Sequence, residues 1–372
     1  MALPISSHED ALIGAKIIED YFDDFNTIED YMRTEKLNSV AELPVTFPGM
    51  ELKHDLFSDF NISPADMDFQ IIEHPDNYTF DSLLEITTTH VGKQSVPGKT
   101  MKWIIKETNT NKVVGFIRFG SPMMMCAPRN KMLGSHPEDM SLFNKSAIMG
   151  FQIVPVQPFG YNYLGGKLMA LICASHFSRR AVNKKYGTNI VLFETTSLYG
   201  KTKGASMYDG LKPFIRYKGN TESNFLPTIK NPTFKKLIAH MEAATNTPNL
   251  DVKDDASSRR LRLQNKCISI IKNSLDDSTH FDNIVERAKN LTEQKRYYVS
   301  DYGIENMTQI IRGEDTEIIK KSNYDNYELE YIIEWWRRKA IKRFDKLKKE
   351  GRLRMEQEVW NDENAVNIDI IR

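Results

Sequence analysis

Glu194 is a candidate general base because of the residues that precede it in the sequence. It follows the apolar run NIVLF at 189–193, which predicts a buried strand. Ligands of open α/β sheets gather at the carboxyl ends of strands, where burial can raise a carboxylate pKa so that it accepts a proton from an amine. The alternative is a glutamate that orders the following loop, TTSLYG, through backbone hydrogen bonds.

A strand interrupted by proline marks a second candidate site. Residues 146–157, SAIMGFQIVPVQ, predict a strand, but Pro155 has no backbone N–H to give to a neighbouring strand. We therefore expect this strand to splay from a neighbour. The peptide groups of Val154 and Val156 would then be exposed to a ligand, and their amides could polarise a carbonyl group.

The turn that follows has the composition of an anion-binding turn. Gly160, Gly165 and Gly166 permit close backbone approach, and a helix is predicted to begin beside Lys167. Free N–H groups at a helix start bind phosphate or another anion, and the Asn162 amide can donate to the same ligand. The alternative is an ordinary strand–turn–helix whose glycines serve packing only.

Aromatic and basic side chains near this turn suggest nucleic-acid contacts. Tyr161 and Tyr163 can stack on a base, or they can belong to the core. Arg129, in the predicted loop 127–135, can pair with a phosphate or with Glu194 or another carboxylate.

Residues 337–354 form the most basic segment, with ten lysines and arginines against two acids. The helical spacing predicts one apolar face and one cationic face. The candidate phosphate contacts are Arg337, Arg338, Lys342, Arg343 and Lys346. The alternatives are a solvated surface helix whose aromatic residues dock on the core, and pairing with the acidic segment EDYFDDFNTIEDYM at 19–32.

Composition excludes several classes of protein. The chain has 372 residues, of which 40% are hydrophobic and 27% charged, a globular profile. No apolar run approaches the roughly 18 residues of a membrane span, and the N-terminus does not resemble a secretory signal. Three distant cysteines predict a reducing cytoplasm. Cys173 and His176 lack a second pair of ligands, so we expect no metal site.

The elements that must position these residues follow from periodicity. The pattern predicts acidic helices within 9–33, a hairpin at 101–121, strands at 146–157, 189–200 and 211–219, and helices at 164–187 and 328–350. We expect three parts: acidic helices and the leading part of the core (1–99), a sheet core (100–232) and a mainly helical, basic C-terminal region (233–372).

The order of these elements resembles the GNAT superfamily of N-acetyltransferases. In that superfamily a bulged strand holds the pantetheine arm of acyl-CoA, and the next turn holds the pyrophosphate through a Q/R-x-x-G-x-G/A signature. Here Tyr161 or Gly160 stands at the Q/R position, depending on the register. The resemblance implies an α/β (α+β) fold with a mixed sheet and flanking helices. It also implies that acyl-CoA or a related donor binds Val154, Val156, Gly160, Asn162, Gly165, Gly166 and Lys167.

Five blocks within 112–222 carry a narrower resemblance. They are KVVGFIRFGSP, PRNKMLGS, FQIVPVQPFGYNYLGGKLMALI, NIVLFETTSLYG and YDGLKPFIRYKGNTES. In this order they resemble a phage and bacterial defence family that includes the A protein of the Druantia system and is similar to the phage DNA-modification protein Mom. Mom-like proteins have an acetyltransferase-type fold and add a carbamoylmethyl group to adenine in DNA.

The resemblance implies a cytoplasmic enzyme that transfers a small acyl-derived group to an exocyclic amine of a DNA base. Glu194 would accept the proton, Tyr208 would protonate the leaving thiolate, and Asp209 would lie in the same site. A tyrosine in a loop can instead be a packing anchor. The alternative function is a DNA-binding or defence-complex component that keeps the fold without catalysis.

Overall fold

The computed structural model describes residues 4–41, 52–73, 76–89, 98–197, 204–221, 226–230, 232–247, 257–291, 295–360 and 367–370. The chain divides into two compact units, Met1–Glu35 with Ser223–Glu293, and Lys36–Glu222 with Gln294–Arg372. Each unit takes segments from two separate stretches of the chain. This division groups the residues differently from the three predicted parts.

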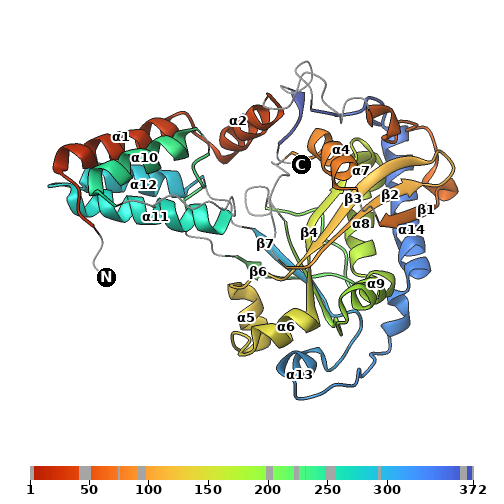
Figure 1. The fold of residues 1–372 in the computed structure, drawn as a ribbon. Coiled ribbons are helices and arrows are strands. Elements are labelled where there is room, and N and C mark those ends of the chain that lie inside the picture. The colour runs from red at the N-terminus through yellow and green to blue at the C-terminus, as the bar shows by residue number, and fades with distance from the viewer. Residues whose placement is uncertain are drawn as a thin grey trace. The chain divides into compact units, whose positions relative to one another are not determined.

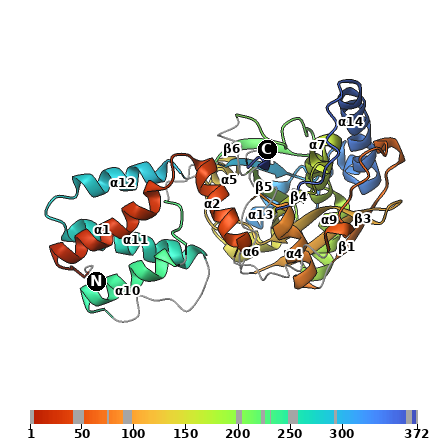
Figure 2. The same ribbon diagram turned by 90° about the horizontal axis from the view of Figure 1, so that it is seen from above.

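The first unit is helical. Its helices are α1 (His8–Asp23), α10 (Thr233–Thr245), α11 (Ser257–Ser274), α12 (Thr279–Lys289) and the start of α2 (Ile28–Ala41). Helix α1 begins where the Ser7 hydroxyl accepts the Asp10 N–H, a standard N-cap. Figure 2 shows α1, α10 and α11 side by side. Their buried apolar side chains, among them Ile18, Leu237 and Ile271, form one core. The acidic helices predicted within 9–33 are confirmed.

The second unit contains a seven-stranded mixed sheet in the order β1-β2-β3-β4-β5-β7-β6. The strands are β1 (Phe69–Glu73), β2 (Thr100–Glu107), β3 (Lys112–Gly120), β4 (Ala147–Pro155), β5 (Leu192–Ser197), β6 (Arg216–Asn220) and β7 (Arg296–Ser300). Within it β4 and β5 are parallel and the other neighbouring pairs are antiparallel. The predicted mixed α/β class and the hairpin at 101–121 are confirmed (Figure 1).

Strand β7 joins the sheet from far along the sequence. It lies between β5 and β6 and pairs with both in antiparallel fashion. The region after 232 is mainly helical, as expected, but the sheet itself extends beyond that residue. Tyr297, Tyr298 and Val299 of β7 are buried, so this strand is central to the core.

Helices cover both faces of the sheet. In this unit they are α4 (Asn77–Thr87), α5 (Ala127–Leu133), α6 (Met140–Ser146), α7 (Phe159–Tyr163), α8 (Gly165–Cys173), α9 (His176–Tyr186), α13 (Met307–Arg312), α14 (Leu329–Lys349) and the 3-10 turns η1 (Leu52–Asp55), η2 (Pro64–Asp66) and η3 (Tyr324–Tyr327). Helix α8 lies on one face of the sheet and α4 on the other, as the contacts of two neighbouring residues of β3 show. The backbone at Gly115 of β3 faces Met169 of α8, and the next residue, Phe116, packs edge-on against Phe80 of α4.

Two local predictions were wrong. The predicted loop at 127–135 contains helix α5, which starts after Cys126 with Pro128 in its first turn and ends at Gly134, where φ is 86°. The predicted helix 164–187 is two helices, because the Ser175 hydroxyl accepts the Ser178 N–H and caps a new start at α9. The helix predicted at 328–350 is confirmed as α14.

Candidate functional site

Strands β4 and β5 run together and then part. Their parallel pairing extends from Ala147↔Leu192 to Gly150↔Thr195. Strand β4 continues to Pro155 beside β3, and the register shift between Arg118 and Phe119 makes Phe151 an extra, bulged residue. Strand β4 therefore separates from β5, as predicted. The separation begins at the bulge rather than at Pro155, which still pairs with Gly115 of β3.

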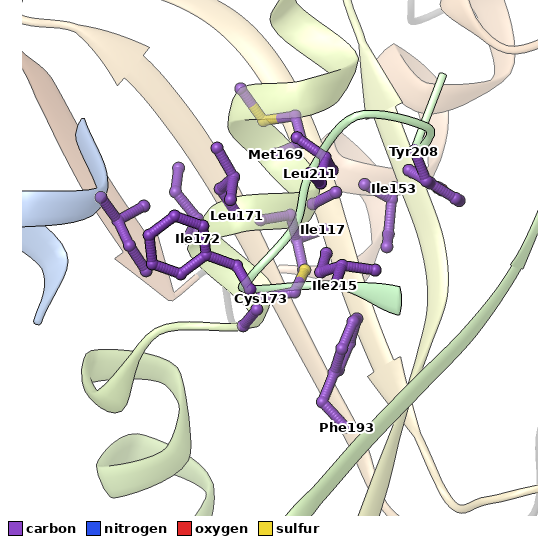
Figure 3. Packing of buried hydrophobic residues seen from close by; sticks show 14 of the residues in the cluster. Ile117, Ile153, Met169, Leu171, Ile172, Cys173, Phe193, Tyr208, Leu211 and Ile215 are labelled. Carbon is purple, nitrogen blue, oxygen red and sulfur yellow. The ribbon is translucent and has the colours of Figure 1, made fainter. Parts of the chain in front are cut away.

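Apolar side chains meet where the two strands part. Figure 3 shows Ile153 of β4 and Phe193 of β5 facing α8 and the segment 208–215. Tyr208 of that segment is only 5% exposed. Burial raises its pKa, so the phenol stays protonated at neutral pH. The Val156 N–H donates to the Val114 carbonyl at 2.9 Å. This amide, which we predicted to bind the acyl donor, is therefore already bonded within the protein.

The start of α8 is covered by Met207, the residue directly before that segment. A Cβ at Gly166 would lie 1.8 Å from the terminal methyl of Met207, so this side chain rests directly on the glycine. The Lys167 ammonium donates to the Met207 carbonyl at 2.8 Å and also to the Asp209 carbonyl. Burial lowers the pKa of Lys167. A donor phosphate at this helix start would have to displace Met207.

The other two glycines serve packing. A Cβ at Gly165 would lie 2.5 Å from the Phe159 ring, and one at Gly160 would lie 2.4 Å from the Gln157 amide nitrogen. These contacts fit the packing alternative that the sequence left open for this turn.

Asp209 belongs to a polar cluster on the α8 side of the sheet. Its carboxylate accepts from the Tyr298 hydroxyl at 2.8 Å, from Arg296 at 3.2 Å and from the Ser206 N–H at 3.0 Å. Burial disfavours the charged form, but these donors outweigh it and the pKa of Asp209 is lowered. The Arg296 guanidinium lies 4.3 Å from the centre of the Tyr217 ring. We call Asp209, Tyr217, Arg296 and Tyr298 the Asp209 cluster.

Glu194 occupies a different environment. The Glu194 and Arg129 side chains are both fully buried and 3.5 Å apart. Glu194 also accepts from the Tyr297 hydroxyl at 2.7 Å and from the Met123 N–H at 3.2 Å. Burial raises the pKa of Glu194, and Arg129 opposes that rise. Arg129 further donates to the Met123 and Met124 carbonyls, at 2.5 and 2.8 Å. Arg129 is thus paired with Glu194, the second of its two predicted partners.

The sheet separates the three predicted catalytic residues. Side chains alternate along a strand, so Glu194 points to the face opposite Phe193 and Thr195. Phe193 faces α8 together with Tyr208 (Figure 3), and Tyr208 hydrogen bonds with Thr195. The structure brings Tyr208 and Asp209 together on one face. It places Glu194 on the other, against α5.

Helix α7 uses its predicted ligand residues for packing. The fully buried Tyr163 ring stacks with Phe159 and Phe344, with ring centres 5.1 and 5.2 Å apart, so no ring face is left for a base. Asn162 is also fully buried and exchanges two hydrogen bonds with the backbone of Arg354. Tyr161 stays partly exposed, with Arg343 and Arg354 over its ring.

Helix α14 docks its apolar face on this region. Trp336 donates to the Tyr163 and Leu164 carbonyls at 3.0 and 3.3 Å. The alternative in which aromatic residues of this helix dock on the core therefore holds for Trp336. Arg337 pairs with Asp68 and Glu334 at 2.8 and 2.6 Å.

The remaining cations of α14 differ in their surroundings. Arg338, Lys342 and Lys346 are all exposed. Lys346 lies 3.9 Å from Glu350, whereas Arg338 and Lys342 have no acidic partner among the described residues. In the acidic segment, Glu19 pairs with His280 and Asp23 with Arg287, both within the helical unit. These acids thus have basic partners of their own.

Neither a metal centre nor a membrane span is found in the part of the chain that the structure describes. No group of three or more His, Cys, Asp or Glu side chains there is arranged to hold a metal ion. None of the described helices is both long and apolar enough to cross a bilayer.

Two residues that complete the Asp209 cluster were not predicted from the sequence. Arg296 and Tyr298 lie on β7, in a region that we predicted to be mainly helical. The run RYYVS at 296–300 is rich in strand-forming residues and was the available signal.

One comparison with known proteins gives a match. The family model described as Druantia protein DruA matches residues 69–204. This segment runs from β1 past the end of β5 and includes the β4–β5 divergence and α8. The match supports a defence-system family for this part of the second unit. No curated protein and no solved structure matches the chain.

Proposed function

We propose that the protein is a transferase that moves a small acyl-derived group from acyl-CoA or a related donor to an exocyclic amine of a DNA base, in the manner of Mom. Adenine is the first base to test. The observation that supports this best is the bulged strand β4, which leaves its parallel neighbour β5 beside the start of a helix. The GNAT superfamily, which the order of elements resembles, binds its donor at such a divergence.

The chemistry would take place on the α8 face. The base amine attacks the donor carbonyl carbon, and the bond from that carbon to the leaving thiolate then breaks, which gives an N-acylated base. A carbamoylmethyl group, as in the Mom product, would instead be joined through its methylene carbon, and the added mass distinguishes the two. Tyr208, which burial keeps protonated at neutral pH, gives its proton to the thiolate. Asp209 is ionised and can accept the proton lost by the amine, although its lowered pKa makes it a weak base. Glu194 takes no direct part, because it lies behind the sheet.

DNA would contact the exposed cations of α14. Three of the predicted phosphate contacts are exposed: Arg338, Lys342 and Lys346. Lys346 lies 3.9 Å from Glu350, so Arg338 and Lys342 are the first to test. A base inside a duplex would have to be flipped out of its stack to reach the donor. The resemblance of residues 69–204 to a defence-system protein is compatible with phage DNA as the target.

Mass spectrometry of nucleosides tests the proposal. DNA from cells that express the wild-type chain should contain a base with an added mass, and DNA from cells that express Tyr208→Phe should not. Tyr186→Phe is the control, because the Tyr186 hydroxyl bonds to the Thr100 backbone, away from the divergence. Unmodified DNA with a well-folded wild-type protein would contradict the proposed reaction.

A second candidate is a DNA-binding defence component without catalysis. The observation in its favour is the covered start of α8, where Met207 lies on Gly166 and Lys167 is bonded to backbone carbonyls. This candidate predicts DNA binding with neither base modification nor affinity for CoA thioesters. Calorimetry with acetyl-CoA on the wild type and on Met207→Ala distinguishes the two, since an uncovered helix start should bind the donor more tightly.

A further inference from the structure

Three arginines converge on one tyrosine outside the proposed catalytic site. The Arg343 and Arg354 guanidinium carbons lie 4.7 and 4.2 Å from the centre of the Tyr161 ring. Arg352 donates to the Tyr161 hydroxyl at 3.3 Å. Arg343 comes from α14, Tyr161 from α7, and the other two from the irregular segment after α14. We call these four residues the Tyr161 cluster.

A buried amide fixes this arrangement. Asn162 donates to the Arg354 carbonyl at 2.7 Å and accepts the Arg354 N–H at 3.1 Å. Its side chain is fully buried, so the two bonds form away from water and hold the segment firmly against α7. The Arg354 backbone is therefore held in place before any ligand arrives, which reduces the ordering cost of binding.

Acidic residues balance this positive charge only in part. Arg352 lies 2.8 Å from Glu350, but Lys346 lies 3.9 Å from the same carboxylate. Arg354 lies 2.8 Å from Glu358 and 3.8 Å from Asp369. For Arg343 the described residues provide no acidic partner, and its recorded contacts are with Tyr161.

The free donors of Arg343 suit a tetrahedral anion. Its Nε bonds to the Tyr161 carbonyl at 3.4 Å, which leaves the two terminal nitrogens of the guanidinium fork. Such forks bind phosphate oxygens in a bidentate manner, and a guanidinium above an aromatic ring keeps its N–H edges available. Arg352 and the Tyr161 hydroxyl lie beside it and can supply further donors.

The cluster also adjoins the start of α8. Lys339, one turn before Arg343 on α14, acts electrostatically on Lys167 and contributes to lowering its pKa. The cationic side of α14 thus extends from the helix start that we propose for the donor to the Tyr161 cluster.

We infer that Tyr161, Arg343, Arg352 and Arg354 form a binding site for a phosphate ester. That phosphate can belong to a nucleotide-type donor or to a nucleic-acid backbone. The inference rests on the proposed function only for these two sources of the phosphate, the donor and the DNA. Neither the geometry of the site nor the binding test requires transfer activity.

The test measures the affinity of the full chain for two probes, inorganic pyrophosphate and a short single-stranded oligonucleotide. The variant Arg343→Gln/Arg352→Gln should lose about tenfold or more in pyrophosphate affinity, since a charge-assisted hydrogen bond is worth at least that factor. Lys348→Gln/Lys349→Gln makes the same change in net charge on exposed positions of α14 and should bind pyrophosphate as the wild type does. Circular dichroism confirms that both variants fold.

The two probes separate the sources of phosphate. Loss for both probes indicates a nucleic-acid backbone, and loss for pyrophosphate alone indicates a small phosphorylated ligand. Wild-type protein that binds neither probe overturns the inference. Equal losses in the cluster variant and the lysine variant also overturn it, because the effect would then be one of net charge alone. A protein that binds phosphate here yet leaves DNA unmodified contradicts the proposed reaction and leaves this site standing.

Discussion

The Glu194 carboxylate and the Arg129 guanidinium form an ion pair in which both side chains are fully buried, 3.5 Å apart. The pair joins β5 to α5. It also holds the backbone of the loop after β3, since Glu194 accepts the Met123 N–H and Arg129 donates to the Met123 carbonyl. Glu194 therefore acts as a positioning residue for this loop.

Glu194→Gln should lower the free energy of unfolding by roughly 3–5 kcal/mol, because it leaves Arg129 buried without a counter-charge. Urea denaturation measures this. Glu73→Gln is the matched control, since Glu73 pairs with Lys185 on the surface and such pairs contribute about 0–1 kcal/mol. A Glu194→Gln protein as stable as the control would show that the buried pair has little net effect on folding.

Tyr208→Phe should abolish base modification and reduce stability by only about 1 kcal/mol, because one hydrogen bond is lost and the ring still fills its place. Nucleoside mass spectrometry and thermal melting measure the two effects. Loss of modification with this small change in stability indicates a proton donor, because a packing anchor would keep its activity when the ring is kept. Full modification by a folded Tyr208→Phe protein would remove this residue from the proposed mechanism.

Gly165→Ala and Gly166→Ala should differ, although the glycines are neighbours at the start of α8. At Gly165 the new Cβ meets the Phe159 ring at 2.5 Å and the Gly160 backbone at 3.2 Å, so we expect a loss of about 1–3 kcal/mol. At Gly166 it meets only the flexible Met207 side chain, which can turn away. Chemical denaturation compares them, and equal losses would contradict this account.

The stability of the protein should depend on pH through His176. The ring is 1% exposed, and its Nε2 lies 2.9 Å from the Tyr324 carbonyl, so Nε2 carries the proton and donates. Burial lowers its pKa from 6.5 to about 4. The unfolded chain therefore binds a proton first as the pH falls. Stability is complete above pH 6.5 and declines down to about pH 4, by about 3 kcal/mol.

His176→Gln keeps a donor toward Tyr324 and cannot titrate. Denaturant unfolding at several pH values should show a difference between wild type and variant that shrinks as the pH falls from 6.5 to 4. A difference that stays constant over this range would mean that His176 is protonated equally in the folded and unfolded states.

The salt dependence of DNA binding should separate the cations of α14. Arg338→Gln/Lys342→Gln should reduce the slope of log affinity against log salt by about 1.8 on duplex DNA, or 0.9 for each phosphate contact. Arg337→Gln should lower stability instead, because Arg337 pairs with Asp68 and Glu334. An unchanged slope in the double variant would place the DNA contacts elsewhere.

Local pattern determined much of this fold. The hairpin at 101–121, the strand up to Pro155 and the amphipathic helix α14 were predicted because side-chain periodicity depends only on near neighbours. The same patterns predicted a splayed strand before a helix start and a possible Arg129–Glu194 pair. Residues 69–204 carry enough of this information to match a family model by sequence alone.

Tertiary structure decided where the side chains act. The alternation of side chains along β5 sends Glu194 away from Tyr208, and only the packed sheet shows which face each residue meets. Strand β7 comes from 296–300 and completes the Asp209 cluster through a long-range pairing that no local pattern encodes. In the same way, Asn162 binds the backbone of Arg354, 192 residues further along the chain, and so brings Arg354 to Tyr161. Such contacts depend on the burial of distant segments together, which a linear sequence does not display.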